Sequence, residues 1–244
     1  DKRFAATLGA GGSICGVSAS IAIGSSVNAE KNHVSISISM VVVWATIMVF
    51  FLPIMSHLLG LTPGEAGAWI GTSEFADAAG IAAAAQFGDA GITSFTLMKV
   101  VGRDMFVGIW AFILAIVSVT KWETHEGGVK PGAGVIWERF PKFVLGFFIA
   151  SFIMTAVTVG ITPEVNDAIN AAIIGPIKSL RTWSFVFCFL CIGLTTRFKE
   201  LASVGMKPVG AFSIGVLVNV ILGFLFSVLI LGHYWTNITQ VFAG

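Results

Sequence analysis

Several long apolar runs constrain the fold of this chain more than any other feature of its sequence. Residues 34–59 and 208–231 are each long enough to cross a bilayer as a helix, which takes about 20 mostly apolar residues. A transmembrane barrel would instead show short segments of alternating polarity. Only 11% of the residues are charged, against roughly 25% in soluble domains. We therefore expect an all-α polytopic membrane protein, and the scattered basic residues argue against nucleic-acid binding.

The apolar runs predict seven membrane segments. They are residues 10–28, 34–59, 66–87, 92–120, 140–160, 183–202 and 208–231. The mildly amphipathic stretch 163–178, which starts with a helix-initiating pattern at Thr162 and Pro163, is expected to lie at the membrane interface.

The distribution of basic residues predicts an orientation in the membrane. If every segment crosses once, most Lys and Arg residues lie on one side, and Lys31, Lys178 and Arg181 lie on the other. The positive-inside rule then makes the first side cytoplasmic and places the C-terminus outside. A re-entrant first or third segment would invalidate this count.

Glycine interrupts the first membrane segment. Four glycines lie between residues 9 and 16, and each costs a helix about 0.5–1 kcal/mol relative to alanine. We expect this run to unwind at membrane depth, where unwound backbone is tolerated only against protein or a water-filled cavity. Ser13, Cys15 and Ser18 could then face a ligand. The alternative is a seam of small residues for close helix packing.

The segment at 183–202 contains a second candidate break. Gly193, Thr195 and Thr196 interrupt a strongly apolar run there. The alternative is an ordinary helix end, with Arg197 and Lys199 in the headgroup region. Two interrupted segments in one chain favour a secondary transporter, in which half-helix ends meet near the bilayer midplane.

Ionisable residues lie in two adjacent apolar segments. Glu74 and Asp77 belong to the segment 66–87, and Lys99, Arg103 and Asp104 belong to the segment 92–120. Such residues are costly at membrane depth and point to function. Two carboxylates on one helix face cannot both ionise easily in a low dielectric, which suits coupling to H⁺ or Na⁺. The two cations would either attract an anion or balance the acids, and Asp104 is expected to hold Arg103.

The cysteines and histidines give little support to a metal site or an enzyme. Cys188 and Cys191 have the CxxC spacing, but no second Cys/His pair accompanies them, so they are better interpreted as small hydrophobic residues. Ser13 or Cys15 could act as a nucleophile only with a nearby base, and the four histidines lie at segment ends or in loops. We expect no enzymatic activity, no metal and no cofactor other than a bound Na⁺ or H⁺.

Four motifs, taken together, resemble those of the YeiH-type family of proposed sulfate exporters. They are SICGVSA at 13–19, GTSEFAD at 71–77, the basic pair at Lys99 and Arg103, and GLTT at 193–196. The family often has His before the Glu and Gln three residues after it, whereas this chain has Ser73 and Asp77. In this chain a carboxylate thus stands where the family often has a neutral Gln.

The resemblance implies a ten-span inverted-repeat fold, distantly similar to sodium/proton antiporters and bile-acid symporters. In that fold the first segment is one broken helix, the segment 183–202 is a second, and the two cross. Residues 1–60 would end the first repeat and residues 61–244 would form the second. Members of the family typically begin further upstream, so we expect the chain to be the C-terminal part of a longer protein.

We therefore expect a secondary active transporter that moves a small inorganic or sulfonated anion, such as sulfate or sulfite, across the inner membrane by alternating access, coupled to H⁺ or Na⁺. The alternative is a cation/proton antiporter on the same fold. The expected partners are the anion and membrane lipid, and a homodimer remains open. Glu74 and Asp77 are the expected ion-coupling residues. The expected substrate-binding residues are Ser13, Cys15, Gly16, Ser18, Lys99, Arg103, Thr195 and Thr196.

Overall fold

The computed structural model describes residues 1–122, 134, 137, 142–159, 161–177, 179–180, 183–184, 187, 190 and 206–243. All regular structure in these residues is helical, which confirms the all-α prediction. Three helical stretches among them are long and apolar enough to cross a membrane: Lys31–Leu58, Asp77–Trp122 and Lys207–Ile230. The chain divides into two compact units, one of Asp1–Phe140 with Phe198–Gly244 and one of Pro141–Arg197.

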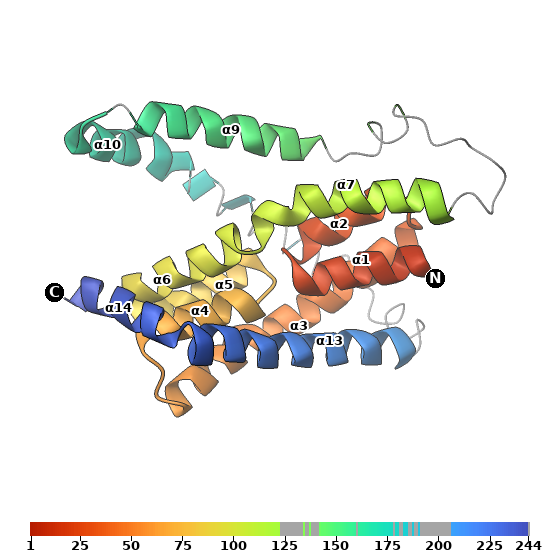
Figure 1. Ribbon diagram of the computed structural model, residues 1–244, viewed down its shortest axis with the longest axis horizontal. Coiled ribbons are helices and arrows are strands. Elements are labelled where there is room, and N and C mark those ends of the chain that lie inside the picture. The colour runs from red at the N-terminus through yellow and green to blue at the C-terminus, as the bar shows by residue number, and fades with distance from the viewer. Residues whose placement is uncertain are drawn as a thin grey trace. The chain divides into compact units, whose positions relative to one another are not determined.

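The first membrane segment is a helical hairpin, here called hairpin 1. It consists of α1 (Lys2–Ser13) and α2 (Val17–Ser26), joined by a short turn. The helices are antiparallel, because Gly24 near the end of α2 packs against Thr7 of α1. Gly16 makes the turn with a φ of +66°, a conformation that a residue with a Cβ atom avoids. The chain therefore returns to the end at which α1 begins (Figure 1).

The glycine-rich run at 9–16 unwinds over a shorter stretch than the sequence predicts. Its first three glycines remain in α1, and only Ile14–Gly16 leaves the helix. Gly11 is needed for packing, because a Cβ atom there would lie 3.0 Å from Ser37 Oγ. The run thus contains both features that the sequence left open, a break at its end and a close-packing seam before it.

The third membrane segment is also a hairpin, here called hairpin 2. Its helices are α4 (Pro63–Ser73) and α5 (Asp77–Ala84), with a short extended stretch between them. A Cβ atom on Gly91 would lie 2.7 Å from the carbonyl oxygen of Ala84 and 3.5 Å from that of Pro63. The end of α5 therefore lies level with the start of α4.

This fold-back differs from the single span expected at residues 66–87. Glu74 follows the last residue of α4, with extended backbone angles, whereas Asp77 begins α5. The two carboxylates consequently lie on either side of a helix break and do not share one helix face. The stretch between them contains neither Gly nor Pro, so its sequence carries no usual sign of a break.

Local sequence signals do fix the base of hairpin 2, the end opposite its turn. Thr62 and Glu65 form a capping box, in which the Thr62 N–H donates to Glu65 Oε2 at 2.9 Å and the Glu65 N–H donates to Thr62 Oγ1 at 3.4 Å. Pro63 occupies the first helical position, where its missing N–H costs nothing. After α5, Gly88 has a φ of +68° and turns the chain into the next helix.

Helix α3 (Lys31–Leu58) connects the bases of the two hairpins. Near its start, Val34 packs against Gly24 of hairpin 1. Near its end, His57 stacks on Phe87 beside the base of hairpin 2, with ring centroids 4.7 Å apart. The hairpins therefore enter this unit from opposite ends (Figure 1).

This arrangement corrects the placement of Lys31. Because hairpin 1 does not cross, Lys31 at the start of α3 lies at the same end of the unit as Lys2. The prediction that Lys31 and Lys2 lie on opposite sides assumed that each segment crosses once. It is wrong for Lys31.

After hairpin 2, residues 85–122 of the second long stretch pass both hairpins in turn. Gly91 near its start packs on Gly67 of hairpin 2, and near its end Ser118 Oγ donates to the Val27 carbonyl beyond hairpin 1 at 3.2 Å. Residues 85–122 alternate between α, π and 3-10 geometry where they pass the turns of the two hairpins. They comprise the 3-10 turn η1 (Ala85–Phe87), α6 (Gly88–Thr96), the π turn η2 (Leu97–Val101), the 3-10 turn η3 (Asp104–Phe106), α7 (Val107–Val117) and the π turn η4 (Ser118–Trp122).

The third long stretch, α13 (Met206–Phe224) with the π turn η6 (Leu225–Ile230), lies beside α4. Trp69 Nε1 donates to the Val220 carbonyl at 3.0 Å. The residues after it form α14 (Gly232–Ala243). This helix covers the start of α4, where the Gly64 N–H donates to Thr239 Oγ1 at 2.8 Å.

The second unit contains three described helical elements, α9 (Phe143–Thr158), α10 (Pro163–Ile169) and the π turn η5 (Asn170–Ile174). Helix α10 begins at Pro163, as the sequence predicts. The expected broken helix at 183–202 cannot be compared, because most of it, with Thr195 and Thr196, lies outside the described residues. Cys188 and Cys191 also lie outside them.

Candidate functional site

The turns of the two hairpins, here called their tips, touch each other in the interior of the unit. A Cβ atom on Gly16 would lie 3.0 Å from the carbonyl oxygen of Phe75 and 3.0 Å from Val41 Cγ1. Phe75 is fully buried, and its ring packs edge-on against Phe212 of α13 at a centroid distance of 5.9 Å. The Gly16 contact thus holds the two tips against each other, and the aromatic pair fixes the tip of hairpin 2 against α13.

Helix ends of both polarities meet at these tips. The helices α1 and α4 end there, and α2 and α5 begin there. The last four C=O groups and the first four N–H groups of a helix lack partners within it, so the ends carry partial negative and positive charges. Neither α2 nor α5 has a side-chain cap at its start. The site therefore needs cations for its carbonyl ends and can offer N–H groups to an anion.

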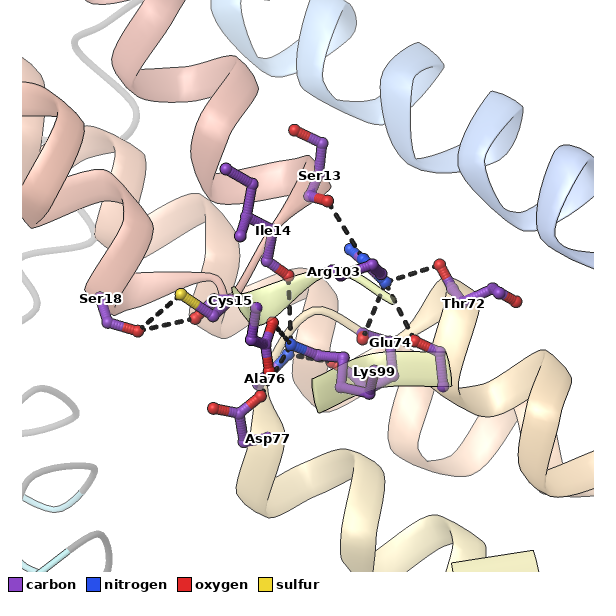
Figure 2. A network of polar contacts seen from close by, with 12 residues as sticks. Ser13, Ile14, Cys15, Ser18, Thr72, Glu74, Ala76, Asp77, Lys99 and Arg103 are labelled. Atoms are coloured by element: carbon purple, nitrogen blue, oxygen red, sulfur yellow. Dashed lines mark hydrogen bonds and ion pairs between the residues drawn. The ribbon is translucent and has the colours of Figure 1, made fainter. Parts of the chain in front are cut away.

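Arg103 hydrogen-bonds to the carbonyl ends of both hairpins (Figure 2). Its Nε donates to the Ser13 carbonyl at 3.1 Å. Its Nη1 donates to the carbonyls of Gly71, Thr72 and Glu74 at 3.2, 2.6 and 3.3 Å. A cation is favourable at a helix C-terminus, and the guanidinium has enough donors to serve two such ends. In this structure Arg103 stabilises the backbone of the tips.

Lys99 links hairpin 1 to two carboxylates. It is fully buried, and its Nζ donates to the Ile14 carbonyl at 3.1 Å. The same Nζ lies 2.7 Å from Asp77 Oδ1 and 2.7 Å from Asp104 Oδ1. A buried ammonium is tolerated only with such partners. Asp104 was expected to hold Arg103, and the structure pairs it with Lys99 instead.

Glu74 is the most isolated of the described acids at the tips. The whole residue is 0% exposed, and its Oε1 accepts a hydrogen bond from the Ala76 N–H at 2.9 Å. Its Oε2 is buried, and no described group hydrogen-bonds to it. A Cβ atom on Gly80 would lie 3.2 Å from Glu74 Cγ, so the side chain folds back into its own hairpin.

The small polar side chains of hairpin 1 are bonded locally. Ser13 Oγ donates to the Gly9 carbonyl at 2.6 Å. Ser18 Oγ lies 3.0 Å from Cys15 Sγ and 3.2 Å from the Cys15 carbonyl oxygen. The hydroxyl oxygens keep lone pairs for another donor, but the structure gives no ligand-binding role to these residues.

The structure thus brings together most of the residues that the sequence singles out. Those at or beside the two tips are Ser13, Cys15, Gly16, Ser18, Glu74, Asp77, Lys99 and Arg103. The sequence missed Phe75 and Thr72, which act through their backbone carbonyls, because a carbonyl contact leaves no trace in residue type. Asn219 Nδ2 donates a hydrogen bond to the Ser73 carbonyl, at the end of α4, at 3.0 Å.

Comparison with known families identifies the chain. Residues 1–212 match the family described as Conserved hypothetical protein 698. The chain belongs to this family. The family assignment confirms the resemblance found in the sequence motifs, and the related chains are named as membrane proteins. Together with the helical stretches of spanning length, this makes the protein an all-α polytopic membrane protein.

Proteins named as membrane proteins are similar to this chain over most of its length. A UPF0324 membrane protein of Rhodopirellula baltica is 34% identical over 223 residues, covering 91% of this chain and 41% of the relative. A UPF0324 membrane protein of Nitrosomonas europaea is 32% identical, covering 84% of this chain and 45% of the relative. The chain thus spans less than half the length of these two relatives. No solved structure matches it.

Proposed function

We propose that the protein is a secondary active transporter that moves a small inorganic or sulfonated anion, such as sulfate or sulfite, across the inner membrane by alternating access, coupled to H⁺ or Na⁺. One observation carries this proposal: two re-entrant hairpins from opposite ends meet tip to tip around buried charges. Interrupted helices whose ends meet near mid-membrane are the usual construction of ion and substrate sites in secondary transporters. Irregular backbone at that depth is otherwise hard to satisfy.

The polarity of the helix ends favours an anion as substrate. Two helix N-termini without side-chain caps lie at the tips, and such ends attract anions. Asp77 already places a negative charge at the start of α5. The start of α2, with Gly16 and Ser18, is therefore the better of the two for a substrate. Ser13, Cys15, Lys99 and Arg103 would complete its surroundings, with Thr195 and Thr196 as further candidates.

The charge balance supports one alternative, a cation/proton antiporter. The described tips hold three acids, Glu74, Asp77 and Asp104, and two cations, Lys99 and Arg103, a difference of one negative charge when all are ionised. Both cations already have protein partners. A monovalent cation could balance the remaining charge.

Ligand protection and transport test the two proposals against each other. Sulfate or sulfite should raise the unfolding temperature of the purified protein, whereas choline chloride at equal ionic strength should not. Proteoliposomes should then accumulate the radiolabelled anion under an imposed H⁺ or Na⁺ gradient. Protection by Na⁺ with no anion flux would favour the antiporter. Absence of both anion and cation flux would exclude either function.

The orientation follows from the ends of the described unit. Lys2, Arg3, Lys31 and Lys121 gather at the end where hairpin 1 enters. Among the described residues of the opposite end, no Lys or Arg is found. By the positive-inside rule, the first end would face the cytoplasm and α14 would lie outside.

A further inference from the structure

We propose that Glu74 carries the coupling proton of this transporter and that Asp77 instead positions Lys99. This inference rests on the proposed transport function. It gives separate roles to two carboxylates that the sequence pattern groups as one coupling pair. It assigns the proton, rather than Na⁺, as the coupling ion.

The environment of Glu74 suits a carboxyl group that exchanges a proton. Its side chain is fully buried, with one hydrogen bond from the Ala76 N–H to Oε1. Its Oε2 has no hydrogen-bond partner among the described residues. An ionised carboxylate in such a place needs a cation or several donors to offset its lost hydration. A proton on Oε2 removes that cost without any rearrangement.

The neighbouring cations do not supply this compensation. Lys99 Nζ is shared between Asp77 and Asp104, at 2.7 Å from each. Arg103 approaches Glu74 only at its backbone carbonyl, at 3.3 Å. Among the described residues, no cation lies within ion-pair distance of the Glu74 carboxylate.

Sodium is a poor fit at the same place. A Na⁺ ion would need several oxygen ligands around Glu74. At the end of α4, the carbonyls of Gly71, Thr72 and Glu74 already accept hydrogen bonds from the Arg103 guanidinium. A second cation there would be repelled by the first.

Asp77 has the opposite environment. Its carboxylate is ion-paired with Lys99, and its side chain is 33% exposed. It is also the first residue of α5, where a negative charge is favourable. Asp77 therefore holds the ammonium that binds the Ile14 carbonyl of hairpin 1.

Proton release from Glu74 would couple to movement of the tip. When the proton passes from Oε2 to a water molecule on one side, a buried negative charge is left in hairpin 2. The tip must then shift to bring the carboxylate to water or to Arg103. Uptake of a proton from water on the other side would reverse the shift.

Transport by two matched variants tests the assignment, with sulfate and sulfite as the probes. With one proton per cycle, a pH gradient of one unit should drive up to about a tenfold accumulation by the native protein. Glu74→Gln should keep exchange of labelled for unlabelled anion and lose accumulation. Asp77→Asn should still accumulate the anion when a pH gradient is imposed, though to a lower level because Lys99 loses one of its two acids, and should unfold at a lower temperature. The inference would be overturned if Glu74→Gln still accumulated the anion under a pH gradient, or if only Asp77→Asn lost accumulation.

Infrared spectroscopy tests the assignment without a substrate. The native protein at neutral pH should show the C=O band of a protonated carboxylic acid. Isotope-labelled glutamate should shift this band and isotope-labelled aspartate should not, a result that requires no variant to fold. A band that follows the aspartate label, or no band at any pH, would overturn the inference. If the native protein showed the glutamate band but transported no anion, the transport function would be refuted. The assignment of a protonated Glu74 would still stand.

Discussion

At the scale of single residues, Arg103 serves as a shared cap for two helix ends. Its hydrogen bonds to the Ser13 and Thr72 carbonyls, at 3.1 and 2.6 Å, join hairpins that enter from opposite ends. A lysine at this position would offer one compact ammonium in place of a planar fork. Its single nitrogen would have to replace two, since Arg103 binds Ser13 through Nε and Thr72 through Nη1.

Arg103→Lys should therefore destabilise the protein although it keeps the charge. Loss of one charged hydrogen bond to a buried carbonyl costs about 1.5–3 kcal/mol, and several bonds are affected here. The measurement is thermal unfolding in detergent, with the exposed Lys2→Arg change at the start of α1 as the control. Equal unfolding temperatures for the two variants would show that Arg103 is not a structural cap.

Lys99 gives a second prediction, because it is buried between two acids. Lys99→Met leaves Asp77 and Asp104 without their shared cation, and breaking a buried ion pair in this way costs about 3–5 kcal/mol. Adding Asp77→Asn and Asp104→Asn removes the uncompensated charges. The triple variant should recover much of the lost stability in the same unfolding assay, and a further loss would contradict the assigned pairing.

The sequence predicts which charged residues gather but not what they contact. Lys99, Arg103, Glu74 and Asp77 are recognisable because ionisable side chains in apolar segments must find partners. Those partners include backbone carbonyls, and a carbonyl becomes available only where a helix ends. The break in hairpin 2 has no sequence signal. The sequence therefore does not predict that Arg103 caps helix ends while Lys99 pairs with acids.

At the scale of elements, the contact between α4 and α6 depends on paired glycines. A Cβ atom on Gly67 would press on the Gly91 backbone, 2.7 Å from its carbonyl carbon. Backbone cannot move aside as a flexible side chain can. Gly215 in α13 is also helical, and a Cβ atom there would meet no atom within 4 Å.

The two glycines should therefore respond oppositely to the same substitution. Gly67→Ala should lower the unfolding free energy by about 1–3 kcal/mol through overpacking. Gly215→Ala should raise it by up to about 1 kcal/mol, because alanine is the better helix former. Chemical denaturation of both variants in detergent measures the difference. Similar effects would mean that α4 and α6 are not in close contact.

The two hairpins differ in how far their sequences reveal them. The glycine-rich run predicts a break in hairpin 1, and the structure has one at Ile14–Gly16. Most of the run remains helical, because Gly11 is used for packing on its neighbours. In hairpin 2 the break is held by tertiary contacts of Glu74, Phe75 and Arg103, which composition does not report.

At the scale of the whole molecule, the hairpins change the expected topology. A seven-crossing scheme places Lys2 and Lys31 on opposite sides of the membrane, and places Gly60 with Lys2. The structure places Lys2 and Lys31 at one end of the unit and Gly60, after α3, at the other. All three residues are exposed.

Single cysteines at these positions distinguish the two schemes. In a protein whose native cysteines are replaced by serine, Lys2→Cys and Lys31→Cys should react with an impermeant maleimide from the same side. Gly60→Cys should react only from the other side. Inside-out vesicles compared with intact cells give the measurement. Labelling of positions 2 and 31 from opposite sides would restore the single-crossing scheme.

The meeting of two short hairpins also has a consequence for how the protein is assembled in the membrane. Helix α1 has 12 residues and is about 18 Å long, well short of the roughly 30 Å hydrocarbon core. The tip of hairpin 1 ends in carbonyls whose partners Lys99 and Arg103 lie 85 and 90 residues later in the chain. Hairpin 1 is synthesised before those residues, and its carbonyls have no such partners in lipid until Lys99 and Arg103 follow. The long spans must therefore be inserted before it, so the order of insertion differs from the order of synthesis.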